Sequence, residues 1–286
     1  MNTIQRLFHT LKFLIEFVYY CIEGFVLKFF HIRKKVTGEI VLVTGSASGI
    51  GRGIALQFAR LGAILVLWDI DEEGNKETAK LVKRNGALAV YVYKCDVSKR
   101  EEIYTVADKV KKEVGVVNIL INNAGIAKTR DFIAIPDSEM EKTMNVNAEA
   151  HFWTCKAFLP AMMACNKGHL VTIASFAALT GGKRLTDYCA SKFAAFGFME
   201  SITCELWAAK QKNIKTTIVF PSFVDTKITS TPFEKLDPEY VAKKIVDAVL
   251  KDQLYVFIPR TLPLITLKIF LPRKAVMLLE EYLGFA

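Results

Sequence analysis

From Glu39 onward the sequence alternates short apolar runs, rich in β-branched residues, with amphipathic stretches. Continuous apolar strands separated by helices are typical of a parallel sheet that is covered on both faces and built from right-handed βαβ units. No internal repeat and no linker long enough to separate two domains interrupts this alternation. We therefore expect one doubly wound α/β domain with about seven parallel strands. The expected strands are residues 39–45, 63–69, 87–96, 117–125, 168–175, 214–221 and 254–259.

The first apolar run leads directly into a glycine-rich turn. Gly45, Gly49 and Gly51 are spaced as G-x-x-x-G-x-G at the junction of the expected first strand and first helix. Glycines at such a turn let the backbone approach a pyrophosphate, and the helix N-terminus supplies amide donors. A tight connection without a ligand is the alternative. Because the turn lies inside a βαβ unit, we favour a dinucleotide site in a Rossmann-type fold.

The second run ends at Asp69. A carboxylate at this point can accept hydrogen bonds from both ribose hydroxyls of adenosine, and it repels a 2′-phosphate. The alternative is a residue that caps the next helix. No Arg or Lys follows directly, and position 48 in the turn is Ser rather than a basic residue, so we expect NAD rather than NADP. Arg52 and Lys76 are the nearby cations that would weaken this preference.

The first 35 residues differ from the alternating part of the chain. The apolar stretch 7–30 is about as long as a membrane span, and the basic HIRKK follows it. At about 100° per residue, its polar residues share one side of a helix: Gln5, His9, Lys12, Glu16 and Glu23. We expect a membrane-anchoring helix in residues 1–35 that lies in the interface, with its basic residues at the headgroups. A tilted or re-entrant span and a helix packed on the core are the alternatives. A cleaved signal peptide is disfavoured because no small-x-small site follows.

Composition narrows the choice of partner. The chain is 52% hydrophobic and has a formal net charge of +9, which suits an anionic lipid surface or nucleic acid. It contains no nucleic-acid motif and no basic helix with interleaved aromatic residues, so we expect lipid and not nucleic acid. The six cysteines form no C-x-x-C pair and have no adjacent histidine cluster. We therefore expect buried thiols in a reducing compartment, with no disulfide frame and no metal site.

Residues 186–198 place a phenol and an ammonium on one helix face. Tyr188 and Lys192 are four residues apart among small and apolar neighbours. The plain interpretation is a lysine that extends to solvent beside a half-buried tyrosine. The chemical interpretation is that the ammonium lowers the pKa of the phenol, which can then exchange a proton near neutral pH. The pair alone does not decide between them.

Seven short motifs between residues 44 and 226 decide the question together. They are TGSASGIG at 44–51, CDV at 95–97, NNAG at 122–125, NVN at 145–147, IAS at 173–175, YCASK at 188–192 and PSFVDT at 221–226. In this order and at these spacings the chain resembles the short-chain dehydrogenase/reductase family. The segments KAFLPAM and DYCASKFAAFGF make it most similar to the 16C branch, with the 17-beta-hydroxysteroid dehydrogenases as the next relatives.

The resemblance implies a catalytic role for four residues. Tyr188 would be the general acid and base, and Lys192 would lower its pKa and hold the nicotinamide ribose. Ser175 would bind the substrate oxygen, and Asn147 would position the lysine and a water. Each has a structural alternative: a strand-end cap for Ser175, a helix-interior polar residue for Asn147 and a solvated side chain for Lys192. In the company of the ordered motifs we expect the catalytic roles.

The resemblance also implies contacts with cofactor and substrate. The cofactor contacts are Gly45, Ser48, Gly49, Ile50, Gly51, Asp69, Asp96, Val97, Asn123, Ala124, Gly125, Tyr188, Lys192, Pro221, Val224 and Thr226. The substrate contacts are Ser175, Phe176, Tyr188 and Phe223, with Ala177, Leu179 and Ile228 as further candidate apolar walls. The alternative for each apolar residue in this set is a place in the core.

Two segments near the expected pocket bear on how open it is. Only KITSTPFEKLD lies between Thr226 and Pro238, whereas the branch usually has a longer, mostly apolar lid there. A short lid leaves the pocket open, alters substrate choice or reduces activity. The apolar extension 261–286 follows the expected catalytic domain 36–260. It closes the pocket, touches the bilayer or completes the core.

The resemblance implies a membrane-associated, NAD-dependent dehydrogenase of lipophilic alcohols, with oxidation of retinol to retinaldehyde as the leading expectation. A 17-beta-type hydroxysteroid dehydrogenase is the alternative enzyme. A lipid-surface protein with weakened catalysis is the alternative from another class. The family likeness further implies the endoplasmic reticulum or a lipid droplet, with the catalytic domain facing the cytosol. It also implies a homodimer through the helices containing 138–165 and 185–209.

Overall fold

The structure is a computed structural model that describes residues 3–29, 33–226 and 235–282. The chain divides into two compact units, Met1–Lys34 and Lys35–Ala286. The first unit contains the single helix α1 (Thr3–Phe29), in which Lys12 and Glu16 lie one turn apart with 3.9 Å between Nζ and Oε1. Among the helices that the structure describes, none combines the length and the apolar character that a membrane crossing requires.

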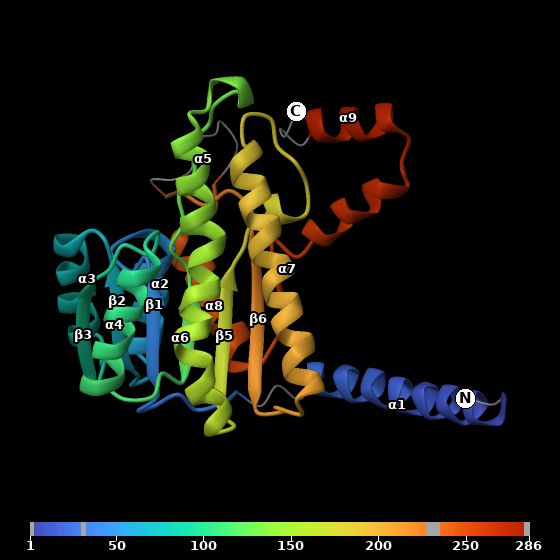
Figure 1. Cartoon of the computed structure of the whole chain (residues 1–286), viewed down its shortest axis with the longest axis horizontal. Helices are drawn as coiled ribbons and strands as arrows, with labels where there is room; N and C mark the ends of the chain where they lie inside the picture. The colour runs from blue at the N-terminus through green and yellow to red at the C-terminus, as the bar shows by residue number, and fades with distance from the viewer. Residues whose placement is uncertain (1–2, 30–32, 227–234, 283–286) are drawn as a thin grey trace. The chain divides into compact units, whose positions relative to one another are not determined.

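The second unit is built on a sheet of seven parallel strands (Figure 1). The strands are β1 (Ile40–Thr44), β2 (Ile64–Asp69), β3 (Ala89–Lys94), β4 (Ile119–Asn122), β5 (Gly168–Ile173), β6 (Ile214–Pro221) and β7 (Tyr255–Ile258). Their order in the sheet is β3-β2-β1-β4-β5-β6-β7. All seven predicted strands are present, and the expected doubly wound α/β fold is confirmed.

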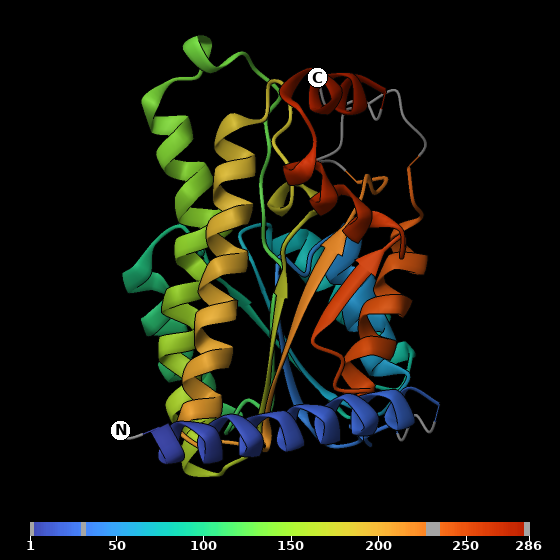
Figure 2. The ribbon, with the colours of Figure 1, turned by 90° about the vertical axis from the view of Figure 1, so that its right-hand side faces the viewer.

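Helices cover both faces of this sheet, as Figure 2 shows. The apolar side chains of β1 alternate between the faces, because successive residues of a strand point in opposite directions. Val41 and Val43 pack with α2 (Gly49–Ala59), α3 (Glu72–Arg84) and α8 (Pro238–Leu250). Leu42 packs on the other face, where α4 (Arg100–Glu113), α6 (Ala150–Ala164) and α7 (Thr186–Ala208) lie. Burial on both sides explains why the strands are apolar without interruption.

The helix that precedes β5 contains a one-turn irregularity. Helix α5 (Asp137–Met144) passes into the π-helical segment η2 (Asn145–Glu149), which continues directly into α6. Single π turns inside helices frequently mark functional sites. Here the segment contains Asn147, whose side chain is fully buried. The sequence did not predict this segment.

The chain reverses its direction of growth in the sheet between β3 and β4. From β1 it proceeds to β2 and β3 on one side, and then it crosses to β4 on the other side of β1. Ligands of open α/β sheets bind at such a switch point, outside the carboxyl ends of the strands. The short 3₁₀ segments η1 (Phe132–Ala134) and η3 (Phe176–Ala178) follow β4 and β5 at this end.

The C-terminal extension is folded over the described part of its length. It contains the 3₁₀ segment η4 (Leu262–Phe270) and the helix α9 (Arg273–Tyr282). Figure 2 shows both elements at the end of the unit toward which the strand arrows point. The extension therefore lies at the carboxyl ends of the strands, where the switch point also lies.

Candidate active site

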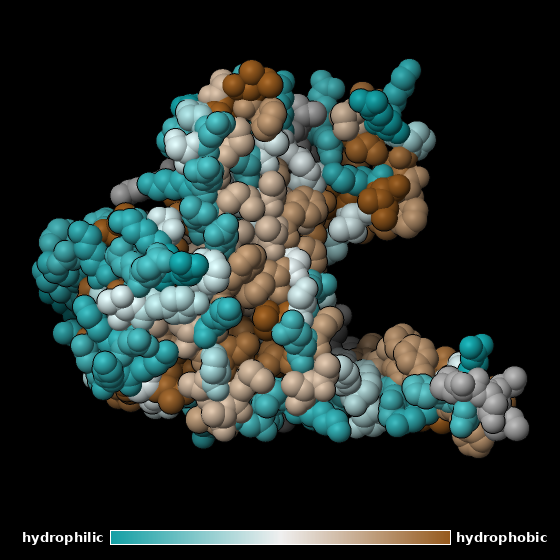
Figure 3. Space-filling model, viewed as in Figure 1, coloured by the Kyte–Doolittle hydropathy of each residue, from teal (hydrophilic) through white to brown (hydrophobic). Residues whose placement is uncertain are grey.

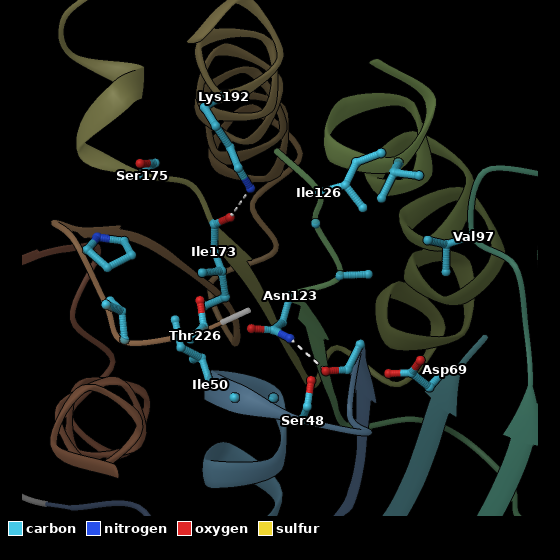
Figure 4. Close-up of a pocket in the computed structure, with 18 of the residues that line it drawn as sticks. Ser48, Ile50, Asp69, Val97, Asn123, Ile126, Ile173, Ser175, Lys192 and Thr226 are labelled. Atoms are coloured by element: carbon cyan, nitrogen blue, oxygen red, sulfur yellow. Dashed lines mark hydrogen bonds between the residues drawn. The ribbon is translucent and has the colours of Figure 1, made fainter. Parts of the chain in front are cut away.

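A cavity of about 350 Å³ lies at the carboxyl ends of the central strands. Every predicted cofactor contact lines it. These residues come from the glycine turn, from the ends of β2, β3 and β4, from helix α7 and from the segment after β6. In Figure 4, Asp69 lies on one side of the cavity and Ser175 and Lys192 lie on the other, with Ser48 and Asn123 between them. This elongated arrangement matches a dinucleotide, which has an adenosine at one end and the reactive ring at the other.

The glycine turn can exist only with glycine at its tightest points. Gly45 has a φ of +66°, in the left-handed region that favours glycine. A Cβ on Gly51 would lie 2.0 Å from the carbonyl oxygen of Gly45, so even alanine does not fit there. The Asn123 amide donates to the carbonyl oxygens of Thr44 (2.9 Å) and Gly45 (3.1 Å) and fixes the turn from the neighbouring strand. The turn is therefore a rigid cradle beside the N-terminus of α2, and its shape fits a pyrophosphate.

Asp69 is held at the edge of the cavity by the backbone. Its Oδ2 accepts a hydrogen bond from the amide of Ala47 (2.8 Å), and its Oδ1 accepts one from Asp71 (2.9 Å). The cap of α3 is Asp71, whose carboxylate accepts from the amide of Gly74, so the capping interpretation of Asp69 is wrong. A carboxylate has about four acceptor positions. Asp69 therefore keeps acceptor positions for ribose hydroxyls.

The two cations near Asp69 are both engaged. Arg52 donates to Glu77 (2.9 Å) and to the hydroxyl of Thr78 (3.0 Å). Lys76 makes ion pairs of 2.8 Å and 2.9 Å with the two acidic residues of the first turn of α3. Both cations are therefore paired with carboxylates of α3.

Tyr188 and Lys192 lie one turn apart on α7 and both line the cavity. Lys192 is 3% exposed, so the interpretation that it extends to solvent is wrong. Its Nζ donates to the carbonyl oxygen of Ile173 at the end of β5 (3.0 Å), as Figure 4 shows. The same Nζ lies 5.8 Å from the centre of the Tyr188 ring. The ammonium is thus fixed beneath the phenol by the sheet.

Burial is the largest cause of the pKa shifts of both residues. It lowers the pKa of Lys192 from 10.5 to about 8. It also raises the pKa of Tyr188, although the hydrogen bond with Ser175 acts in the opposite direction. The sequence predicted that Lys192 lowers the pKa of the phenol. The net change in the pKa of Tyr188 is upward, because desolvation of the phenolate is its largest cause, and this net change does not test the separate effect of the ammonium.

Ser175 and Asn147 are positioned by their own backbone contacts. The Ser175 hydroxyl accepts from the amide of Ala177 (3.1 Å), so it caps η3 and lines the cavity at the same time. The Asn147 amide closes two hydrogen bonds of 2.8 Å with the backbone of Ile126, and it also donates to Ser191 (3.0 Å). Asn147 therefore lies behind the cavity wall and ties the segment after β4 to α7.

Some predicted residues lie elsewhere. Within the described residues, the cavity wall includes neither Phe176 nor Phe223. Phe176 is 5% exposed, because it follows the extended Ser175 and turns inward at the start of η3. Leu179 packs against the core on the face covered by α6 and α7. Ile228 and most of the predicted short lid (227–234) lie outside the described residues.

The cavity also contains residues that the sequence reasoning missed. They are Ile70, Cys95, Ile126, Lys142, Val146, Ile173, Ala174 and Ser222. All except Ile70 and Lys142 lie within or directly beside a quoted motif, and Ile70 directly follows Asp69, so extending each motif or predicted contact by one residue would have found all but Lys142. Lys142 carries no sequence signal, because it comes from the turn of α5 that faces the cavity. Burial raises the pKa of Cys95 to about 12, so this thiol stays protonated and unreactive.

Comparison with known proteins identifies the relatives of this chain. The sequence profile of the short chain dehydrogenase family matches residues 39–237. Epidermal retinol dehydrogenase 2 from Mus musculus is 55% identical over 267 residues, which are 89% of this chain and 86% of the relative. Family 16C member 6 from Bos taurus is 50% identical and covers 97% and 91% of the two chains. Estradiol 17-beta-dehydrogenase 11 from Pongo abelii is 46% identical and covers 91% and 88%.

Solved structures share the fold. A short chain dehydrogenase/reductase from Burkholderia phymatum in complex with NAD superposes with a TM-score of 0.75 at 25% identity, over 83% of this chain and 96% of the other. A metagenomic short-chain oxidoreductase in complex with NADP superposes with a TM-score of 0.68 at 27% identity, over 78% and 96%. The resemblance that the motifs indicated, including that to the 16C branch, is confirmed.

Proposed function

The chain belongs to the short-chain dehydrogenase/reductase family, and on that premise we propose that it oxidises a lipophilic alcohol, retinol to retinaldehyde, with NAD. The observation that carries the proposal is that Ser175, Tyr188 and Lys192 line one cavity together with the glycine cradle and with Asp69. The identity to a retinol dehydrogenase supports the choice of substrate.

The residues of the chain divide the chemistry between them. Ser175 Oγ donates a hydrogen bond to the alcohol oxygen and fixes the carbinol carbon. Tyr188 Oη takes the hydroxyl proton as general base. When bound, NAD supplies the acceptor for the hydride that leaves the carbinol carbon, and its ring carries a positive charge. The fixed ammonium of Lys192 and that ring both favour the phenolate, and they oppose the desolvation that raises the pKa of Tyr188.

NAD is the proposed cofactor because of what surrounds the adenosine end. Asp69 keeps acceptor positions for the ribose hydroxyls and would repel a 2′-phosphate. Arg52 and Lys76, the cations that NADP would need, are paired with carboxylates.

Replacement of Asp69 tests this choice. We expect Asp69→Ala to raise the Kd for NAD about 10- to 100-fold, as the loss of charge-assisted hydrogen bonds predicts, and to narrow or reverse the preference over NADP. Fluorescence titration with each cofactor measures the two Kd values, and their ratio gives the preference for NAD over NADP. Asp71→Ala is the matched control, since it removes a neighbouring carboxylate that only caps α3. Equal effects of the two substitutions on the ratio, or tighter binding of NADP by the unchanged protein, would contradict the assignment.

A hydroxysteroid is the second candidate substrate. The specific observation in its favour is the 46% identity to estradiol 17-beta-dehydrogenase 11. Separate assays with retinol and with estradiol distinguish the two, with the rate of NADH formation from each as the readout. We expect retinol to be turned over faster, and a clear advantage of estradiol would reverse the proposal.

A lipid-surface protein without turnover remains the candidate from another class, because the segment between Thr226 and Pro238 is short. The intact catalytic set argues against it. Helix α1, with its polar residues on one side, supports a place for the protein at a membrane interface. We propose the cytosolic surface of the endoplasmic reticulum or of lipid droplets.

A further inference from the structure

We propose that η4 and α9 form a second lipid-docking surface at the substrate side of the active site, so that a lipophilic alcohol enters the cavity from an anionic membrane. The inference rests on the proposed function for the nature of the substrate. It concerns a surface of the catalytic unit itself, and it is independent of α1.

Both elements carry several large apolar side chains that are exposed. Ile269 is 76% exposed and Phe270 is 78% exposed, at the end of η4. Leu264, Leu267, Leu278 and Tyr282 extend the set over both elements, and all are more than half exposed. Brown side chains gather over this part of the surface in Figure 3. Single exposed apolar residues are ordinary, but a cluster of this kind marks a binding surface.

The inner side is fixed to the catalytic unit. Lys268 makes an ion pair of 2.6 Å with Glu280, and both also bond to the hydroxyl of Thr180. Glu280 and Thr180 are buried, and Ile265 is 6% exposed. This clamp joins η4, α9 and the loop after η3. The apolar outer face is therefore presented by an anchored element and not by a loose tail.

The positive charges near η4 and α9 indicate which kind of partner the surface binds. Arg260, Arg273 and Lys274 are exposed, and no carboxylate of the described residues forms an ion pair with any of them. An apolar face edged by unpaired cations complements anionic headgroups above an acyl layer. A second copy of the chain would bring the same positive charges and would repel this surface. The surface therefore fits a lipid bilayer that contains anionic lipid.

The surface adjoins the catalytic end of the cavity. The clamp residue Thr180 lies in the loop that leads from Ser175 and η3 into α7. The charge of Lys268 also lowers the pKa of Cys189, the neighbour of Tyr188, although burial raises it more strongly. Docking of η4 and α9 would bring the membrane to the side of the cavity where the alcohol must bind, which spares a lipophilic substrate a passage through water.

Quenching by brominated lipids tests the docking without depending on activity. The full chain carrying Phe270→Trp is bound to vesicles of brominated phosphatidylcholine, with and without phosphatidylserine. Leu88→Trp is the matched control, since Leu88 is also exposed but precedes β3 at the opposite end of the strands. We expect the added emission of Trp at 270 to be quenched at least severalfold more than that of Trp at 88, and most strongly with phosphatidylserine. Equal quenching at the two positions would overturn the proposal.

A kinetic comparison separates docking from catalysis. We expect the double substitution Ile269→Asp and Phe270→Asp to raise the KM for retinol in vesicles about tenfold, with kcat and the turnover of a short, water-soluble alcohol unchanged. An equal loss for both substrates would overturn the proposal, because it would indicate damage to the site. If the unchanged protein oxidises no alcohol, the proposed function fails, and the quenching result still decides whether the surface binds lipid.

Discussion

At the scale of single residues, the site places a charged group where its charge is costly. Lys192 is buried beside the cavity, and among the residues that the structure describes its Nζ has one protein hydrogen bond, to the carbonyl oxygen of Ile173. Burial of an ammonium without a carboxylate partner opposes folding, and the lowered pKa of Lys192 expresses that cost. We propose that the protein keeps this residue for its charge in the reaction and not for its contribution to the fold.

Replacement of this lysine should therefore stabilise the protein. Lys192→Met removes the buried charge, and we expect it to raise the free energy of unfolding at pH 7 by about 1–3 kcal/mol, less the lost hydrogen bond. The pKa of Lys192 is about 8 in the folded protein and 10.5 in the unfolded chain, so the unfolded chain binds more protons between these values. The stability of the unchanged protein thus rises with pH across that window, and the advantage of the variant should vanish above it.

Denaturant titration at pH 7 and above pH 10.5 measures both differences. The exposed Lys156→Met is the control and should change little. A variant that is less stable than the unchanged protein at pH 7 would refute the idea that the buried charge is costly.

At the scale of elements, the sequence predicted most of the regular structure and missed what depends on tertiary contacts. The seven strands follow from continuous apolar runs, and the glycine cradle follows from spacing. The π-helical turn at Asn147 has no such signal, because nothing in the local sequence distinguishes it from the α-helix on either side. Phe176 was misplaced for a related reason: the direction of a side chain just after a strand depends on the turn that follows. Capping of α3 was the alternative role for Asp69, and hydrogen bonding shows that Asp71 is the cap.

The cradle at the start of α2 offers a test at this scale. Gly51→Ala would place a Cβ 2.0 Å from the Gly45 carbonyl oxygen, and backbone cannot yield there without opening the turn. We expect the Kd for NAD to rise at least tenfold and the melting temperature to fall. In α7, Gly197→Ala meets no atom within 4 Å and should stabilise the helix by roughly 0.5–1 kcal/mol. Calorimetry measures the melting temperature of each variant, and cofactor titration measures its Kd for NAD. An unchanged Kd in Gly51→Ala would contradict the assignment of the glycine turn as the pyrophosphate cradle.

At the scale of the whole molecule, the chain consists of two compact units. The catalytic unit has its own core on both faces of the sheet, while α1 forms a unit of its own. We expect removal of residues 1–34 to leave cofactor binding and the turnover of a water-soluble alcohol intact. The same truncation should lower the fraction of protein that floats with vesicles, and the surface on η4 and α9 would account for any binding that remains. Flotation and cofactor titration measure the two effects, and loss of cofactor binding would show that the units depend on each other.

In the proposed mechanism, Tyr188 is the base of a retinol dehydrogenase. The most direct measurement is NADH formation from retinol by membranes that contain this chain, compared with the same membranes containing Tyr188→Phe. We predict activity that falls by about 10²- to 10⁴-fold in the variant, the usual contribution of a general base, while NAD binding stays unchanged. Equal rates in the two proteins, or no oxidation by either with NAD still bound, would contradict the account.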